Sequence, residues 1–282
     1  VPSVASARYK KAFQRHTPKY AEYVAALVKG DPSVKVNASA IFPHDVLKGR
    51  ISLYGFQSMT KTELDMIQMQ WEALPNYVGN ANILPLVDVS GSMTCSVGGN
   101  NNLTCLDVSV SLGLYLADKN KGKFKDTFLT FSGSPELLHL NGNINQKIDQ
   151  MIKSKWAMDT NLVAAFEKIL SVAVKGNVPQ NEMPEMLLIL SDMQFNQCVH
   201  FDDSAIEMIR RKYQAAGYEV PRVVFWNLHA HDNVPVKFDE QGTALVSGFS
   251  PSILKSLLAS DMDAFTPESI MLNTVMIDRY SI

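Results

Sequence analysis

The chain has 282 residues and a nearly balanced charge, with 26 Lys and Arg against 28 Asp and Glu. Hydrophobic residues make up 46% of it and charged residues 19%, which excludes collagen-like, coiled-coil and wholly disordered proteins. No apolar run reaches the roughly 18 residues that a transmembrane helix needs. We therefore expect one or two globular domains with no membrane contact.

The cysteines indicate a reducing compartment. There are three, Cys95, Cys105 and Cys198, which is too few for a disulfide framework, and none forms a Cys-x-x-Cys pair. No secretory signal precedes them, so we expect a cytoplasmic protein in which Cys95 and Cys105 are reduced, although they could pair if oxidised. Because the chain opens with Val1 and not with Met, we also expect that it is a piece of a longer protein.

Charge is uneven along the chain. Residues 1–50 hold nine Lys and Arg against three Asp and Glu, whereas the remaining residues hold 17 against 25. This pattern suits helices that dock on a core and leave a basic face in solvent, which is the simpler interpretation. It also suits contacts to RNA phosphates, since aromatic residues alternate with the basic ones. The candidate RNA contacts are Arg8, Lys10, Lys11, Arg15 and Lys19.

The first 78 residues read as a helical lead-in. Residues 4–28 predict two helices separated by Thr17 and Pro18, with Pro18 at the first helical position. A short helix is expected at about residues 45–48. A longer helix over residues 60–74 opens with a capping box of Thr60 and Glu63.

From about residue 79 the pattern changes to short apolar runs that alternate with helical periodicity. This predicts an α/β fold, a three-layer, doubly wound, mostly parallel, Rossmann-like sheet, with one antiparallel edge strand. The predicted parallel strands are 83–89, 127–131, 186–190, 220–228 and 243–248, and the antiparallel one is 136–140. The predicted helices are 103–119, 145–152, 162–174, 203–216, 250–259 and 267–278.

Oxygen-bearing side chains follow the strands at the edge where open α/β sheets bind ligands. The first strand ends in Asp88, Ser90 and Ser92, Thr160 precedes a helix, and Asp192 follows a later strand. Carboxylates and hydroxyls without imidazole or thiolate suit Mg²⁺ or Mn²⁺. The alternative is that Asp88 and the serines only cap the next turn.

This set resembles the metal-ion-dependent adhesion site of von Willebrand factor A domains, whose pattern is Asp-x-Ser-x-Ser, then Thr, then Asp. The resemblance implies that Ser90, Ser92 and Thr160 contact the metal directly, and that Asp88 and Asp192 hold it largely through water. A rim for partner binding is expected around it. The rim candidates are Gly91, Asn100, Ser132, Asp159 and Gln194.

Further phrases narrow the resemblance. Pro43-His44-Asp45, Trp156 to Thr160, Ser191 to Phe195 and Phe225 to Leu228 look like the family called domain of unknown function 2828. The layout of that family is similar to the TROVE ribonucleoproteins, where a helical ring binds small RNAs. Residues 94–102 are longer than expected for the family and could form either a loop that gates the site or a loose surface insertion.

Other chemistry finds little support. Two imidazoles, His229 and His231, lack further ligands in reach and are expected to be surface residues. There is no Gly-x-Ser-x-Gly elbow, no P-loop and no candidate general base, so we expect no enzyme.

The sequence therefore predicts a metal-dependent protein-binding domain that captures an Asp or Glu of a partner. An RNA-binding ribonucleoprotein component is the alternative, and a scaffold without metal is a third possibility. The two main readings differ in their expected response to salt and to chelator.

Overall fold

The computed structural model describes residues 2–51, 59–79, 81–97, 100–130, 134–154, 161–192, 203–229 and 243–247, with 272, 275 and 276. Helix 250–259, predicted from the sequence, lies outside these residues, and helix 267–278 lies almost wholly outside them. The helices are α1 (Ser3–Arg8), α2 (Lys10–His16), α3 (Tyr20–Val28), α4 (Pro43–Leu47), α5 (Lys61–Glu72), α6 (Cys105–Lys119), α7 (Ile144–Lys153), α8 (Leu162–Gly176) and α9 (Asp203–Ala215).

Six strands form one sheet in the order β5-β4-β1-β6-β7-β8, and β5 alone runs antiparallel to its neighbour. All six correspond to strands predicted from the sequence, so the doubly wound α/β fold with an antiparallel edge is confirmed. The strands are β1 (Ile83–Val87), β4 (Thr127–Thr130), β5 (Leu137–His139), β6 (Met186–Ser191), β7 (Arg222–Asn227) and β8 (Thr243–Ser247).

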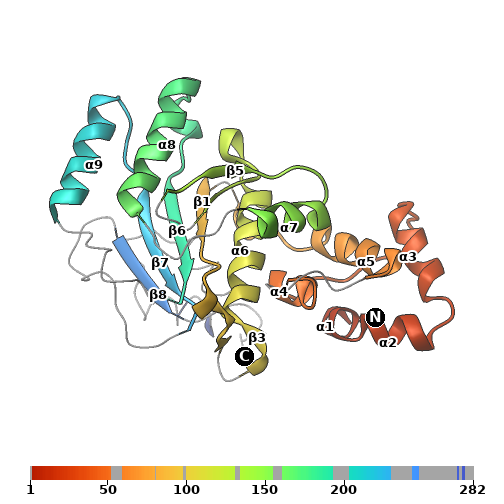
Figure 1. Cartoon of the computed structure of the whole chain (residues 1–282). Coiled ribbons are helices and arrows are strands. Elements are labelled where there is room, and N and C mark those ends of the chain that lie inside the picture. Colours follow the sequence, from red (N-terminus) through yellow and green to blue (C-terminus); the bar gives the residue numbers. More distant parts are fainter. Residues whose placement is uncertain are drawn as a thin grey trace.

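The central strands are buried on both faces, which explains their uninterrupted apolar runs. Alternate residues of β1 enter two different cores: Ile83 and Val87 pack with α6, whereas Leu84 and Leu86 pack with α8 and α9. Figure 1 shows the resulting layers, with α8 and α9 on one side of the sheet and α6 on the other. Helices α1–α5 lie beyond α6.

Helix α6 approaches β1 closely because Gly113 has no side chain. A Cβ atom at Gly113 would lie 2.3 Å from Cγ2 of Val87, a distance that packed atoms do not adopt. Glycine in a helix interior ordinarily weakens it, so this position trades local stability for contact. The contact fixes α6 against the last residue of β1, immediately before Asp88.

The N-terminal helices differ in detail from the sequence expectation. Residues 4–28 form three helices, since the chain also breaks at Tyr9, and Pro18 lies in a turn before α3 instead of at its first position. The capping box of α5 is confirmed: Thr60 Oγ1 accepts from Glu63 N at 3.3 Å, and Thr60 N donates to Glu63 Oε2 at 2.8 Å.

These helices share a core with the α/β part. Val46 of α4, Ile67 and Trp71 of α5, and Val87 of β1 belong to one continuous buried cluster. Hydrogen bonds cross the same boundary, because Tyr115 Oη of α6 donates to Pro75 O at 2.6 Å and accepts from Tyr77 N at 2.8 Å. Helices α4 and α5 are therefore packed against the α/β part, whereas α3 packs on α5 in a smaller core of Tyr20, Val24 and Met66.

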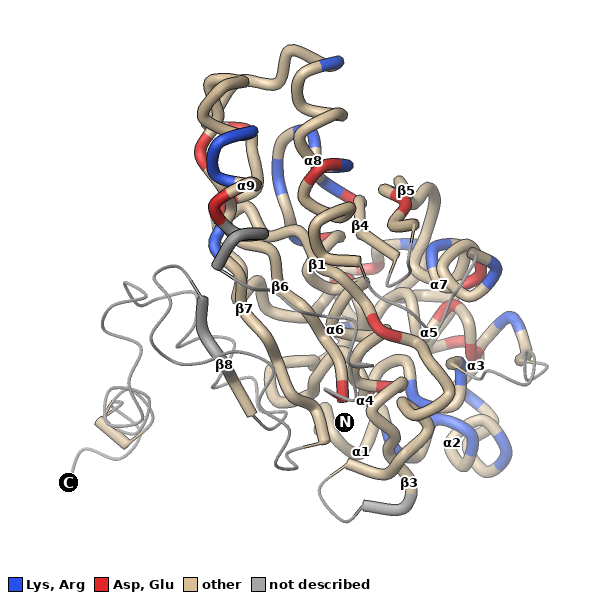
Figure 2. The backbone as a smooth tube through the Cα atoms, turned by 60° about the vertical axis from the view of Figure 1, so that its left-hand side comes forward, with Lys and Arg blue, Asp and Glu red and all other residues tan. Residues whose placement is uncertain are grey.

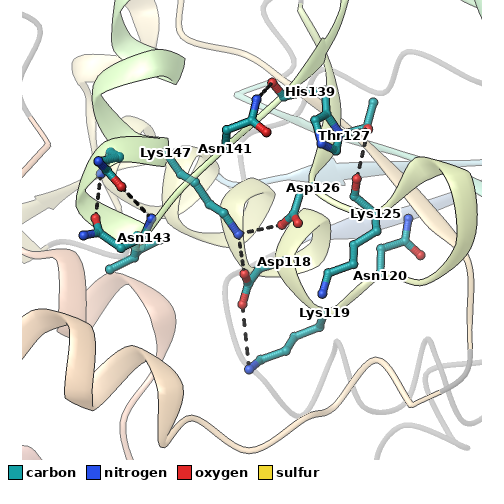
Figure 3. A network of polar contacts seen from close by, with 12 residues as sticks. Asp118, Lys119, Asn120, Lys125, Asp126, Thr127, His139, Asn141, Asn143 and Lys147 are labelled. Atoms are coloured by element: carbon teal, nitrogen blue, oxygen red, sulfur yellow. Dashed lines mark hydrogen bonds and ion pairs between the residues drawn. The ribbon is translucent and has the colours of Figure 1, made fainter. Parts of the chain in front are cut away.

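A charged network ties the layers together at α7 (Figure 3). Lys147 Nζ lies 2.6 Å from Asp118 Oδ1 and 2.6 Å from Asp126 Oδ1. Burial alone would lower the pKa of Lys147, but the hydrogen bonds to both carboxylates outweigh it and the pKa is raised. Trp71 Nε1 of α5 donates to the other oxygen of Asp118 at 3.1 Å, so the network reaches the helical segment.

The basic N-terminal segment is partly buried. Seven of its Lys and Arg residues are exposed, and the positive stretches along α2 are visible in Figure 2. Lys10 is buried, so its prediction as an RNA contact is wrong. It is 6% exposed, and its Nζ donates to Val46 O at 2.9 Å. The other four candidates, Arg8, Lys11, Arg15 and Lys19, are exposed.

Burial of Lys10 makes stability depend on pH. Desolvation lowers its pKa from 10.5 to about 8, against the attraction of Glu63. Between these values the unfolded chain binds more protons than the folded one, so the free energy of unfolding rises with pH, by about 3 kcal/mol in all. Urea unfolding at pH 7 to 10 should show this rise in the wild type and lose it in Lys10→Met. Lys11→Met, an exposed neighbour, should keep it, and parallel curves for the wild type and Lys10→Met would contradict the assignment.

Candidate metal centre

The strand order reverses direction at β1, and the candidate site lies at this point. From β1 the chain adds β4 and β5 on one side, and it then crosses over to add β6, β7 and β8 on the other. Ligands of doubly wound sheets bind at such a switch point, beyond the carboxyl ends of the strands. Asp88 follows β1 and Asp192 follows β6, and Asp88 N donates to Leu190 O at 3.0 Å, which extends the pairing of these strands.

The turn after β1 brings two hydroxyls together. Ser90 N donates to Asp88 Oδ1 at 2.8 Å, an Asx-type turn that reverses the chain at once. The turn leads into a short 3-10 helix, η1 (Gly91–Thr94). Ser90 precedes η1 and Ser92 lies in it, and their Oγ atoms are 2.9 Å apart. Two hydroxyl oxygens at this separation can occupy neighbouring positions around one cation.

Asp88 is held from several directions. It is 3% exposed, and its Oδ2 accepts from Ser191 Oγ at 2.6 Å. Burial raises the pKa of Asp88, the hydrogen bonds from Ser191 and Ser90 oppose this, and the nearby charge of Asp192 adds to the increase. A buried carboxylate next to a second one is the environment in which a bound cation lowers the electrostatic cost.

Asp192 is buried as well, with 5% exposure. Its backbone N lies 3.2 Å from Met93 Sδ, and Met93 is fully buried. The backbone N of Asp192 thus donates to the Met93 sulfur, and this contact joins η1 to the end of β6.

A second group of hydroxyls supports the site from α6. Ser109 is completely buried, and its Oγ lies 3.0 Å from Asp88 O and 3.2 Å from Leu190 O. Its hydroxyl thus joins the ends of β1, β6 and α6. The contacts of Ser109 and Ser191 were not predicted; the available signals were the two serines, Ser109 and Ser111, among the apolar residues of α6, and a serine directly before Asp192.

The structure brings together four of the five predicted ligands, Asp88, Ser90, Ser92 and Asp192. The fifth, Thr160, lies outside the described residues, as do the rim candidates Asp159, Ser132 and Gln194. Of the remaining rim candidates, Gly91 is exposed at the start of η1, and Asn100 begins the strand β3 (Asn100–Thr104), where only its backbone is described. Asn161, which follows Thr160 in the chain, caps α8: its Oδ1 accepts from Ala164 N at 3.0 Å.

The donor set fits a hard divalent cation. Two carboxylates and two hydroxyls are oxygen ligands of the kind that Mg²⁺ or Mn²⁺ prefers. Across the described part of the chain, no three His, Cys, Asp or Glu residues gather as a conventional metal cluster. A site that depends on hydroxyls would not produce such a cluster. His229, which was expected to be a surface residue, is half-buried, and His231 lies outside the described residues.

The described residues of the insertion after Met93 form two paired strands. Strand β2 (Ser96–Val97) pairs antiparallel with β3, with an irregularity in register between Ser96 and Val97. The sequence prediction began the next helix at residue 103, which is wrong because residues 103–104 belong to β3 and α6 begins at Cys105. Thr104 caps this helix, accepting from Asp107 N at 3.1 Å.

The fold, with hydroxyls and carboxylates at the switch point of a mostly parallel sheet, is that of a von Willebrand factor A-like domain preceded by helices. A family model described as Domain of unknown function (DUF7788) matches residues 82–276, and the chain belongs to this family. The sequence motifs resemble the family called domain of unknown function 2828, whereas the family model that matches is DUF7788.

The chain is also similar to one curated protein sequence and to one solved structure. It is 30% identical over 297 residues to Uncharacterized protein L728 of Acanthamoeba polyphaga mimivirus, covering 98% of this chain and 49% of that protein. The crystal structure of the Deinococcus radiodurans RO (RSR) protein is similar, with a TM-score of 0.50 and 16% identity, over 92% of this chain and 48% of that one. The chain thus spans about half the length of each. This likeness extends the comparison from the α/β part to the N-terminal helices.

Membrane insertion finds no support in the described residues, since none of their helices has both the length and the apolar character that a bilayer span requires.

Ser109 offers a test of the hydroxyl support. Ser109→Ala leaves two buried carbonyl groups without this donor and should lower the free energy of unfolding by about 1–2 kcal/mol. Ser111, two residues along the same helix, is a matched control: it is 1% exposed, and its Oγ finds no hydrogen-bond partner within the described structure. Urea unfolding of Ser111→Ala should show no loss of stability. Equal losses in both variants would mean that the hydroxyl of Ser109 contributes nothing specific.

Proposed function

We propose that this chain is a metal-dependent binding protein, which uses the cluster at the switch point to hold Mg²⁺ or Mn²⁺ and to capture an acidic group of a protein partner. The observation that carries the proposal is the convergence of Asp88, Ser90, Ser92 and Asp192 at the ends of β1 and β6, with two carboxylates buried side by side. Thr160 completes the proposed ligand set by its match to the adhesion-site pattern.

The proposed mechanism assigns each side chain a separate task. Ser90 and Ser92 supply neutral oxygens, so that few negative charges neutralise the ion and it keeps an affinity for a further anion. Asp88 is held by Ser191 and by the Ser90 amide, which keeps its carboxylate oriented without a large movement on binding. The ion, when bound, supplies an open coordination position for an Asp or Glu of the partner. Gly91, which is exposed beside the serines, leaves room for that side chain to approach.

The metal site is tested by thermal unfolding with EDTA, Mg²⁺ or Mn²⁺. A metal at 100 times its dissociation constant should stabilise the wild type by about 2.7 kcal/mol, and Asp88→Asn should abolish this gain. The exposed carboxylate Asp31 gives the control, since Asp31→Asn should respond to metal like the wild type. If neither metal shifts the midpoint of the wild type, the chain has no such site when it is free of a partner.

A second candidate function is RNA binding as part of a ribonucleoprotein. The fold comparison supports this candidate more than it supports metal-dependent protein binding, because the likeness to the Deinococcus RO protein covers 92% of the chain and so includes the helical segment. The residues add support, since Arg8, Lys11, Arg15 and Lys19 are exposed on or between α1, α2 and α3, where Tyr9 is exposed beside them. In this reading the basic helices contact phosphates and the α/β part binds a partner. The finer resemblance, to TROVE proteins and to domain of unknown function 2828, belongs with this candidate.

RNA binding is tested by the salt dependence of affinity for a single-stranded RNA oligonucleotide. Binding should weaken steeply with salt, and the double variant Arg15→Ala with Lys19→Ala should lower the slope of log K against log salt by about 0.7 for each phosphate contact that is lost. Lys168→Ala, which removes an exposed lysine from α8 on the opposite side of the sheet, should leave the slope unchanged. Binding should also survive EDTA and Asp88→Asn. An affinity that is independent of salt would exclude this candidate.

A further inference from the structure

Two cysteines face each other at the base of the β2–β3 hairpin. The pairing of Ser96 with Thr104 places Cys95 and Cys105 directly opposite one another, one position outside the hairpin, and Cys105 N donates to Cys95 O at 3.0 Å. Their sulfur atoms are 3.3 Å apart. Residues opposite each other in an antiparallel pair have Cα atoms about 4.5–5.5 Å apart, which is within the range that a disulfide spans.

The two thiols differ in mobility and in access. Cys105 is fully buried in the first turn of α6, and that turn is fixed by the reciprocal hydrogen bonds of Thr104 and Asp107, at 3.0 and 3.1 Å. Cys95 is half-buried and follows directly after η1. An oxidant can therefore reach Cys95 first, with Cys105 already in position behind it.

We propose that Cys95 and Cys105 form a reversible disulfide that locks the metal-binding turn to α6, so that oxidation tunes the affinity of the candidate metal centre. The link to metal rests on the proposed function. Cys95 N donates to Ser92 O at 3.0 Å, and Thr94 Oγ1 donates to Gly91 O at 2.8 Å, so the backbone that presents Ser92 is continuous with Cys95. Fixing Cys95 restricts this backbone before the ion binds.

The proposed oxidant is a hydroperoxide. The sulfur of Cys95 attacks one oxygen of hydrogen peroxide, which breaks the O–O bond and gives a sulfenic acid and one water. The sulfur of Cys105 then displaces the sulfenic oxygen as a second water, so two thiols and one peroxide become one disulfide and two waters. Burial raises the pKa of both thiols, which keeps the thiolate fraction low and slows the attack on peroxide.

The test uses the whole chain with Cys198→Ser, which removes the third cysteine and keeps the pair. After hydrogen peroxide treatment, free thiols are blocked with N-ethylmaleimide and the peptides are examined by mass spectrometry without reduction. We expect a Cys95–Cys105 linked peptide that dithiothreitol abolishes, and an unfolding midpoint about 5 °C higher in the oxidised protein. Adding Cys95→Ser should remove both effects. Recovery of Cys95 and Cys105 as separately blocked thiols, or Cys95 as a sulfinic acid, overturns the proposal.

The link to the metal centre is measured separately, as the dissociation constant for Mn²⁺ in the oxidised and reduced forms of the Cys198→Ser protein. We expect binding about threefold to tenfold tighter after oxidation, and no change on peroxide treatment in the protein that also carries Cys95→Ser. A disulfide that leaves Mn²⁺ affinity unchanged overturns the regulatory part. Absence of Mn²⁺ binding in both forms would instead refute the proposed metal centre, while intact Mn²⁺ binding without a linked peptide would refute only the disulfide.

Discussion

The pairing of β1 with β6 is the constraint on which the rest of the structure depends. Five consecutive residue pairs, from Ile83 with Met186 to Val87 with Leu190, place the two strands in register at the centre of the sheet. Because the register is fixed inside a core buried on both faces, the residues that follow each strand have no freedom to slide. The separation of Asp88 from Asp192 is therefore set by the sheet, and the loops only complete what the strands have positioned.

Several hydrogen bonds offset the cost of burying Asp88 and Asp192 near each other. Two carboxylates are brought out of water next to one another, which alone would be unfavourable. Hydroxyl and amide donors from Ser191 and Ser90 compensate at Asp88, and Ser109 and the Gly113 contact bring α6 close without adding another charge. A protein that needed these acids only for a turn could expose them. Their burial is the feature that favours the proposed binding site over an ordinary cap.

Much of the fold could be predicted from sequence because its determinants are local. Apolar runs marked all six sheet strands, and the capping residues Thr60 and Glu63 marked α5. The hairpin strand β3 was missed because Asn100 to Asn102 is polar and resembles a loop, and its pairing depends on a partner strand and not on its own composition. Lys10 was misplaced for a similar reason, since only tertiary packing shows that its ammonium group donates to Val46 O. Of the candidate site, Asp88, Ser90, Ser92 and Asp192 were predicted from their spacing, whereas Ser109 and Ser191 form tertiary contacts that no linear motif indicates.

The burial of helix α6 matters during synthesis, because its partners are made at different times. All but three of its 15 residues are buried, because the sheet covers one side and α4 and α5 cover the other. A helix that is apolar all round has no face suited to water and must find two partners. During synthesis α4 and α5 leave the ribosome before α6, and most of the sheet leaves after it. Helices α4 and α5 can thus cover one apolar face of α6 before the later strands are synthesised. In this way a segment of the same chain does what a chaperone does for many proteins, which is to keep an apolar surface away from water.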